Sequence, residues 1–99
     1  MEADSIYRKS EEITVDGFGS CDVYYMRPGT HEKKHYHDGI EIVYIVKGSC
    51  KTHKEGEVYI YQKEQVHEVI NDSGEELVFV CLTIPPESKN NTHYLKEND

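Results

Sequence analysis

Turn-forming residues interrupt this chain about every ten residues, and this spacing leaves room only for short strands. Gly or Pro marks most of the interruptions from Gly17 to Pro86. The runs between them are rich in Val, Ile and Tyr, which favour strands. We predict strands over residues 12–15, 21–26, 33–37, 40–46, 49–53, 57–61, 67–71 and 76–84. Short strands at this spacing are typical of a sandwich or barrel, so we expect an all-β fold.

The kinds of apolar residue support this fold class. The chain has nine Val, eight Ile and eight Tyr, but only three Leu and one Ala. Leu and Ala are the residues that a helix would favour. No segment shows the periodicity of a convincing helix, and we find no internal repeat.

Length, charge and cysteine content exclude several functional classes. A length of 99 residues fits one domain. The net charge of −8 argues against a nucleic-acid partner and against charge-driven binding to anionic lipid. No apolar run is long enough for a membrane span, and none near the N-terminus is typical of a secretory signal. Three cysteines without a CxxC pair fit a reducing cytoplasm, which is the location we expect.

Two of the predicted strands are apolar on both faces. Val43 and Ile45 face one way, while Ile42, Tyr44 and Val46 face the other, and residues 77–84 show the same pattern. A strand exposed on one side would alternate apolar and polar residues. We therefore expect a homodimer to cover the outer faces, with the N-terminal segment folded across them as the alternative. We expect one domain over residues 1–86 and a polar, frayed tail over 87–99.

The histidines carry the strongest chemical signal. His35 and His37 are separated by one residue, so on a strand they share a face, and neutral imidazole is a common metal ligand. Glu41 follows His37 after Asp38-Gly39-Ile40. A two-residue hairpin loop would place Glu41 on the opposite face, whereas a three-residue loop would place it beside His37. We prefer the three-residue loop because it also turns Val43 and Ile45 inward. His67 begins a later strand and is a candidate fourth ligand.

The spacing around these residues resembles the two motifs of the cupin superfamily. The first reads Gly29-(five)-His35-Tyr36-His37-(three)-Glu41-(six)-Gly48. The second keeps Gly56, His67 and Asn71 in register. It departs at Gln62, where the family often has Pro, and at Glu64, where the family often has Gly. These departures concern the type of turn and leave the ligand in place.

The resemblance implies a jelly-roll β-barrel with a metal ion inside its mouth. It carries His35, His37, Glu41 and His67 over as the metal ligands. The implied cofactor is one divalent transition metal ion, either iron, manganese, nickel, cobalt or zinc, because a mixed nitrogen and oxygen site suits all of them. At an octahedral ion, two positions would stay open for water or substrate.

A cupin fold does not by itself fix a reaction. We expect a small metalloenzyme of the dioxygenase, isomerase or decarboxylase type, acting on a small oxygen-rich organic molecule. The alternative is a non-catalytic module that binds or senses a sugar or small acid, and a third reading is a scaffold with a relic site. No general base can be named from the sequence.

The remaining histidines and two tyrosines receive plainer interpretations. His31 and His93 lie in polar segments, where we expect them to be solvated. His53 reads as the exposed end of a strand. Tyr59 and Tyr61 share a strand face and fit a substrate pocket, an interface or the core equally well.

Overall fold

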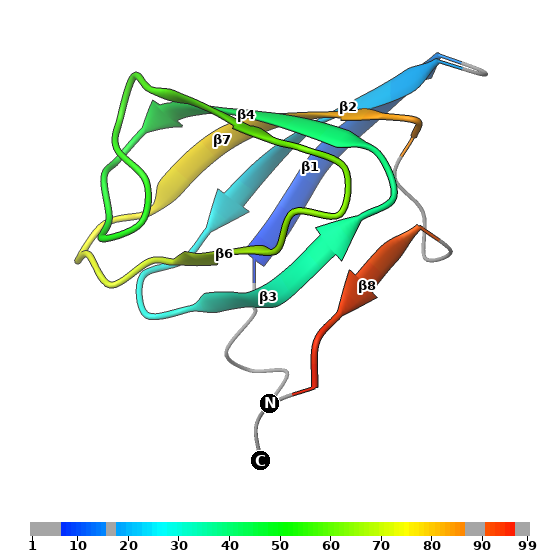
Figure 1. Cartoon of the computed structure of the whole chain (residues 1–99). Helices are drawn as coiled ribbons and strands as arrows, with labels where there is room; N and C mark the ends of the chain where they lie inside the picture. Colours follow the sequence, from blue (N-terminus) through cyan, green and yellow to red (C-terminus); the bar gives the residue numbers. More distant parts are fainter. Residues whose placement is uncertain (1–6, 16–17, 87–90, 97–99) are drawn as a thin grey trace.

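All the regular secondary structure in the described part of the chain is β-strand, as the sequence predicts (Figure 1). The computed structural model describes residues 7–15, 18–86 and 91–96. The strands are β1 (Tyr7–Val15), β2 (Gly19–Met26), β3 (His31–His37), β4 (Ile40–Lys47), β5 (Val58–Tyr61), β6 (His67–Ile70), β7 (Leu77–Ile84) and β8 (Thr92–Tyr94). The described part of the chain holds no helix with the length and apolar character that a membrane crossing requires.

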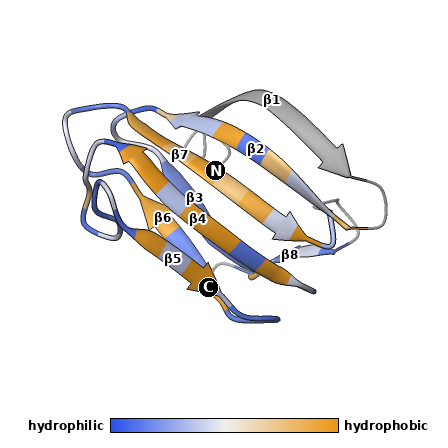
Figure 2. Ribbon diagram, turned by 90° about the horizontal axis from the view of Figure 1, so that it is seen from above, coloured by the Kyte–Doolittle hydropathy of each residue, from blue (hydrophilic) through white to orange (hydrophobic). Residues whose placement is uncertain are grey.

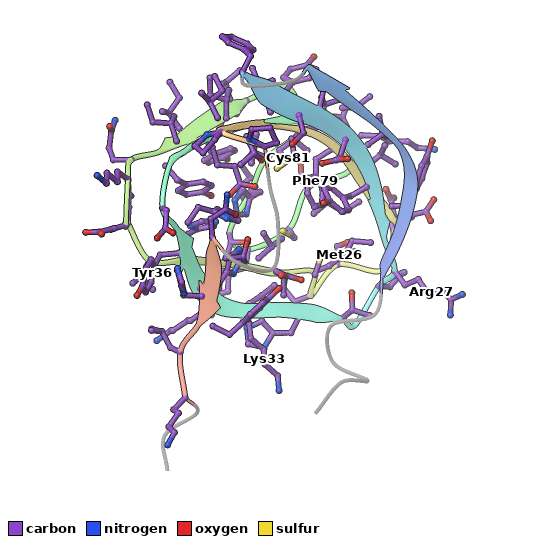
Figure 3. The ribbon with its side chains drawn as sticks, turned by 90° about the vertical axis from the view of Figure 1, so that its right-hand side faces the viewer. Met26, Arg27, Lys33, Tyr36, Phe79 and Cys81 are labelled. Carbon is purple, nitrogen blue, oxygen red and sulfur yellow. The ribbon has the colours of Figure 1, made fainter. Side chains whose placement is uncertain are left out.

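The strands form two antiparallel sheets that enclose a common interior (Figures 1 and 3). The larger sheet has the order β1-β2-β7-β4-β5, and the smaller one has the order β6-β3-β8. Strands distant in sequence become neighbours in this arrangement: β2 pairs with β7, and β3 pairs with β6 and β8. Segments that are far apart in the sequence thus surround one interior.

Alternation along the central strands builds the core. In β7, every second residue from Leu77 to Thr83 is buried, while those between are partly exposed. Val43 and Ile45 of β4 point inward as predicted. Figure 3 shows Phe79 and Cys81 directed into the interior. A period of two is the expected pattern for strands that wrap around a core.

The connection between β3 and β4 differs from the predicted hairpin. β3 pairs in the small sheet and β4 pairs with β5 and β7 in the large sheet, so the chain crosses between sheets at Asp38 and Gly39. A Cβ at Gly39 would collide with the carbonyl oxygen of Ile84, so glycine lets the chain make this close corner. The corner still aims His37 and Glu41 at each other, which is the outcome that the hairpin was expected to provide.

Two further expectations differ from the structure. Residues 49–53 were expected to form a strand, but the amide of Cys50 donates to the carbonyl of His53 at 2.7 Å and closes a turn. The polar tail was expected to be frayed from residue 87 onward, yet Thr92–Tyr94 form β8 and pair with β3. Hydrophobic pattern alone does not find β8, because its pairing with β3 depends on tertiary position.

Several apolar side chains of β4 and β5 are exposed, and Figure 2 shows hydrophobic residues along both strands. Tyr44 and Val46 on β4 are 44% and 45% exposed, and Val58 and Ile60 on β5 are 56% and 55% exposed. We call these four residues the β4–β5 face. The N-terminal segment from Tyr7 does not cross it, because β1 lies beside β2 at the opposite edge of the large sheet.

Candidate metal centre

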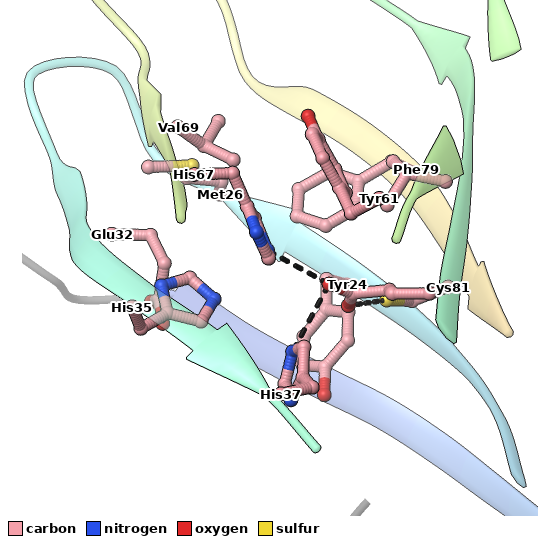
Figure 4. Close-up of a pocket in the computed structure, with 12 residues that line it drawn as sticks. Tyr24, Met26, Glu32, His35, His37, Tyr61, His67, Val69, Phe79 and Cys81 are labelled. Atoms are coloured by element: carbon pink, nitrogen blue, oxygen red, sulfur yellow. Dashed lines mark hydrogen bonds and ion pairs between the residues drawn. The ribbon is translucent and has the colours of Figure 1, made fainter. Parts of the chain in front are cut away.

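The four residues predicted as ligands lie together inside the barrel (Figure 4). β3 supplies His35 and His37, β4 supplies Glu41, and β6 supplies His67. One ligand atom from each lies within 4.8 Å of the others. His35, His37 and Glu41 are buried, at 5%, 4% and 6% exposure. His67 reaches the group because β6 pairs with β3, which sets His67 opposite His35.

Hydrogen bonds at Nδ1 orient the three imidazoles. The Nδ1 of His35 lies 2.6 Å from the carbonyl oxygen of Lys33, and that of His67 lies 3.1 Å from the carbonyl oxygen of Gln65. A carbonyl only accepts, so Nδ1 carries the proton in both rings and Nε2 keeps its lone pair. The Nδ1 of His37 lies 3.1 Å from the Thr92 hydroxyl oxygen. The two carbonyls fix the tautomers of His35 and His67, whereas a hydroxyl can donate or accept and therefore fixes only the orientation of the His37 ring.

Glu41 faces two of these Nε2 atoms. Its Oε1 lies 3.0 Å from Nε2 of His37 and 2.8 Å from Nε2 of His67. Nε2 of His67 and Oε1 are both buried, and each is an acceptor when Nε2 carries no proton. Two buried acceptors in contact require a cation or a proton between them.

The spacing of these donors fits a transition metal ion. Two ligand atoms about 2.1 Å from one ion and at right angles to each other are about 3 Å apart. The distances from Oε1 to the two imidazole nitrogens match this separation. Three imidazoles and one carboxylate form the mixed nitrogen and oxygen set that suits iron, manganese, cobalt, nickel or zinc.

The electrostatics of the site favour the protonation states that a metal ion requires of His35 and Glu41. Burial lowers the pKa of His35 to about 4, so its imidazole is neutral at physiological pH. Burial alone would raise the pKa of Glu41, but the contacts with His37 and His67 hold it well below its usual range. Glu41 is therefore ionised. Metal binding needs this state, because imidazoles bind as neutral groups and carboxylates as anions.

A cavity of about 40 Å³ adjoins the four residues. It is lined by the four proposed ligands and Glu32 together with apolar residues that include Met26, Val69 and Phe79 (Figure 4). A space of this size admits a few water molecules or a small group of a bound molecule. The pocket thus combines polar groups with an apolar lining.

Two lining residues add to the site: Cys81, which was not identified from the sequence, and Tyr61, for which a substrate pocket was one of three interpretations. Tyr61 stacks on His67, with ring centroids 3.8 Å apart and planes at 5°. The Cys81 thiol donates to Oε2 of Glu41. Tyr61 pairs with Glu41 across β4 and β5, so the two residues share a face of the sheet. Cys81 lies on the buried face of β7, which the alternation of residues along this strand defines.

His53 was expected at an exposed strand end, and that expectation is wrong. Only 2% of the residue is exposed, and its Nε2 lies 2.5 Å from the Tyr61 hydroxyl. Burial lowers the pKa of His53 to about 4 and raises the pKa of Tyr61, so neutral His53 accepts from protonated Tyr61. The turn at Cys50 directs His53 inward. The prediction failed because it treated residues 49–53 as a strand.

The other two histidines lie outside the cluster. His31 is partly exposed and its Nε2 lies 3.7 Å from a carboxylate oxygen of Glu68. His93 lies 3.0 Å from Asp38 at the corner between β3 and β4. Neither belongs to the group of possible metal ligands found in the described part of the chain.

Solved structures with this fold include proteins from several bacteria. A conserved protein of Klebsiella pneumoniae with a double-stranded β-helix domain has a TM-score of 0.72 and 18% identity, over 98% of this chain and 89% of its own. A cupin domain from Bordetella pertussis has a TM-score of 0.63 and 19% identity, over 81% and 94%. Ectoine synthase from P. lautus has a TM-score of 0.62 and 17% identity, over 97% and 83%.

These likenesses establish the double-stranded β-helix fold. No curated protein matches the chain. The family described as "Cupin domain" matches residues 22–83, which contain both motifs and all four residues of the candidate metal centre. The chain therefore belongs to the cupin family.

Proposed function

We propose that this cupin binds one divalent transition metal ion through His35, His37, Glu41 and His67, and acts on a small oxygen-rich organic molecule. The observation that carries the proposal is the meeting of four oriented donors at the wall of an internal cavity. Structural metal sites are closed on all sides by protein ligands, whereas catalytic sites keep a position open. Here the cavity lies against the ligand group and leaves space for a further molecule.

When bound, the ion supplies a Lewis acid that polarises substrate oxygens, or a redox centre if it is iron. The chain itself supplies orientation. The apolar lining of Met26, Val69 and Phe79 excludes water and accepts a hydrocarbon part of the substrate. Small diketones, enediols and hydroxy acids have this combination of paired oxygens and a short carbon skeleton.

Glu32 is the candidate acid–base group. It lines the cavity beside His35, and its Oε2 accepts a hydrogen bond of 2.6 Å from the Tyr94 hydroxyl. A carboxylate that is not a metal ligand and faces the substrate space suits proton transfer in an isomerase or decarboxylase. Tyr61 is a weaker candidate, because its hydroxyl is directed to His53.

A second candidate function is non-catalytic binding of a small acid or sugar. The observation in its favour is that Glu32 and Tyr61 both hold protein hydrogen-bond partners. A binding module uses such fixed groups for recognition and needs no proton transfer. The fold does not decide between the two functions, although one solved structure with this fold is an ectoine synthase.

The test begins with elemental analysis of protein purified without chelators, where we expect close to one transition metal ion per chain. The loaded protein is then assayed for oxygen uptake with diketones and catechols, and for isomerisation of hydroxy-carbonyl compounds. Turnover that Glu32→Gln reduces supports the enzyme. Compounds that raise the melting temperature of the loaded protein without turnover support the binding module. Absence of metal binding contradicts the metalloenzyme.

A further inference from the structure

The C-terminal strand β8 reaches into the metal centre from outside the family motifs. It pairs with β3 so that Thr92 lies opposite His37 and Tyr94 lies opposite His35. Opposite residues of an antiparallel pair share a face of the sheet. Thr92 and Tyr94 are therefore on the same face as the two β3 histidines, while His93 faces the other way and stacks with Tyr36.

His37 differs from His35 and His67 because a side chain, the Thr92 hydroxyl, contacts its Nδ1 in place of a backbone carbonyl. The Nδ1 atoms of His35 and His67 contact carbonyls two residues earlier in their own segments. The Nδ1 of His37 instead contacts the side chain of Thr92, 55 residues later in the chain. The orientation of the His37 ring, with Nε2 toward the other ligands, thus depends on β8 being in place.

Tyr94 adds a second contact from the same strand. Its ring lies 5.1 Å from the ring of His35, at an angle of 32°, and its hydroxyl donates to Glu32. Thr92 and Tyr94 together join β8 to two of the proposed ligands and to the candidate acid–base group.

β8 is also a short edge strand. It spans three residues, and it borders only β3 in the small sheet. Backbone hydrogen bonds flank it, from the amide of Asp38 to Asn91 and from the amide of Leu95 to Lys34, each 3.0 Å long. Short edge elements open at a low free-energy cost compared with the core, so a modest interaction can change how often β8 is docked.

We propose that β8 is a metal-coupled part of the site, in which Thr92 is the positioning residue for His37. This inference rests on the proposed metal site. Docked β8 holds the His37 ring through Nδ1, so that Nε2 is directed toward Glu41 and the other proposed ligands. Thermodynamic linkage requires the converse, so that a bound ion favours the docked strand by the same factor.

The first test measures zinc affinity by calorimetry in the full chain. Thr92→Val keeps the shape but removes the hydroxyl, so the His37 ring loses the hydrogen bond that holds its Nδ1. We expect affinity to fall about tenfold, at the lower end of the effect of such partners. Thr92→Ser keeps the hydroxyl and is expected to restore most of the affinity. Thr30→Val is the matched control, because that hydroxyl donates to the Arg27 carbonyl in the β2–β3 turn.

The second test measures hydrogen exchange of the Asp38 and Leu95 amides with and without saturating zinc. A tenfold coupling predicts about tenfold slower exchange in the wild type with zinc, and a smaller effect in Thr92→Val. Equal zinc affinity of wild type and Thr92→Val, or equal loss in Thr92→Ser, overturns the role of Thr92. Unchanged exchange on adding zinc overturns the coupling. Failure of the wild type to bind zinc or any other divalent ion overturns the metal site and this inference together.

Discussion

The Cys81 thiol donates a hydrogen bond to Oε2 of Glu41, while the other carboxylate oxygen faces His37 and His67. Cys81 is 2% exposed and comes from β7, the strand next to β4. Because each oxygen of Glu41 has a different neighbour, the carboxylate is held in one orientation. Oε1 is the oxygen available to an ion.

Removing the Cys81 thiol should loosen this orientation. In Cys81→Ala the buried Oε2 loses a donor, so we expect zinc affinity to fall by about tenfold, as for other partners of metal ligands. Cys81→Ser keeps a donor and should retain more affinity than the alanine variant. Titration calorimetry gives the affinities, and the visible spectrum of the cobalt-loaded variants reports the geometry. Cys21→Ala, on the half-exposed face of β2, is the control. Equal affinities of Cys81→Ala and wild type would contradict the role.

The four proposed ligands give the next prediction. His35→Ala or His67→Ala removes a direct bond to the ion, so metal content after purification should fall well below one per chain, and the double variant should retain almost none. His31→Ala is the control, since His31 lies outside the cluster and should leave metal content unchanged. Elemental analysis measures each variant, with thermal unfolding to verify the fold. Full occupancy in the double variant would rule out the assignment.

The sequence predicted the interior of the barrel better than its corners. The inward direction of Val43 and Ile45 was predicted correctly, because alternation follows directly from strand geometry, whereas the two apolar faces of residues 77–84 left the inward face of β7 open. The pairing of His37 with Glu41 across a hairpin was wrong, because the sequence does not say which sheet a strand joins. The spacing of the cupin motif nevertheless predicted that His37 and Glu41 lie close together. This prediction holds because the motif describes positions around the site and does not depend on the type of turn between them.

Partners contributed by distant segments could not be predicted. Thr92 contacts His37 across 55 residues, and His53 reaches Tyr61 only because the chain turns at Cys50. Neither contact leaves a periodic signal. A polar tail and a polar strand also have the same composition, so β8 was indistinguishable from a frayed end.

Glu64 provides a stability prediction. It occupies the position where the cupin motif often has Gly, and its φ is 63°, in the left-handed region. Its amide donates to the His37 carbonyl at 2.8 Å, which fixes this conformation. Glu64→Gly should relieve the backbone strain and raise the free energy of unfolding by about 0.5–1 kcal/mol, after the entropy cost of glycine. Urea unfolding measures the change, with Lys63→Gly expected to destabilise. A destabilised Glu64→Gly would contradict the strain.

The β4–β5 face predicts a homodimer. Four exposed apolar residues on adjacent strands form a continuous patch, which soluble monomers seldom present. Light scattering at micromolar concentration should give twice the chain mass of 11.5 kDa. Ile60→Lys places a charge in the patch and should return the mass to that of one chain. Lys54→Ala, in the exposed turn before β5, should leave it unchanged. A wild-type mass of 11.5 kDa would mean that the face stays uncovered.

Buried neutral histidines predict how stability depends on pH. The folded pKa values of His35 and His53 are about 4, and the ordinary value is 6.5. Between these values the unfolded chain binds protons that the folded chain does not, so the free energy of unfolding falls as pH decreases. From pH 7.5 to 5 each histidine should contribute a loss of about 2 kcal/mol. The lowered pKa of Glu41 changes the free energy of unfolding only below its ordinary value of 4.5, which lies outside the interval from pH 7.5 to 5.

His53 allows this prediction to be tested without changing a proposed ligand. In His53→Gln the amide oxygen can accept from Tyr61 but does not titrate. Metal-free protein is unfolded in urea at intervals from pH 7.5 to 5, with a chelator present. The variant should lose about 2 kcal/mol less than the wild type over this range, whatever its stability at pH 7.5. Equal losses would mean that His53 takes up its proton in the folded protein as readily as in the unfolded chain. The buried hydrogen bond to Tyr61 would then not hold His53 neutral.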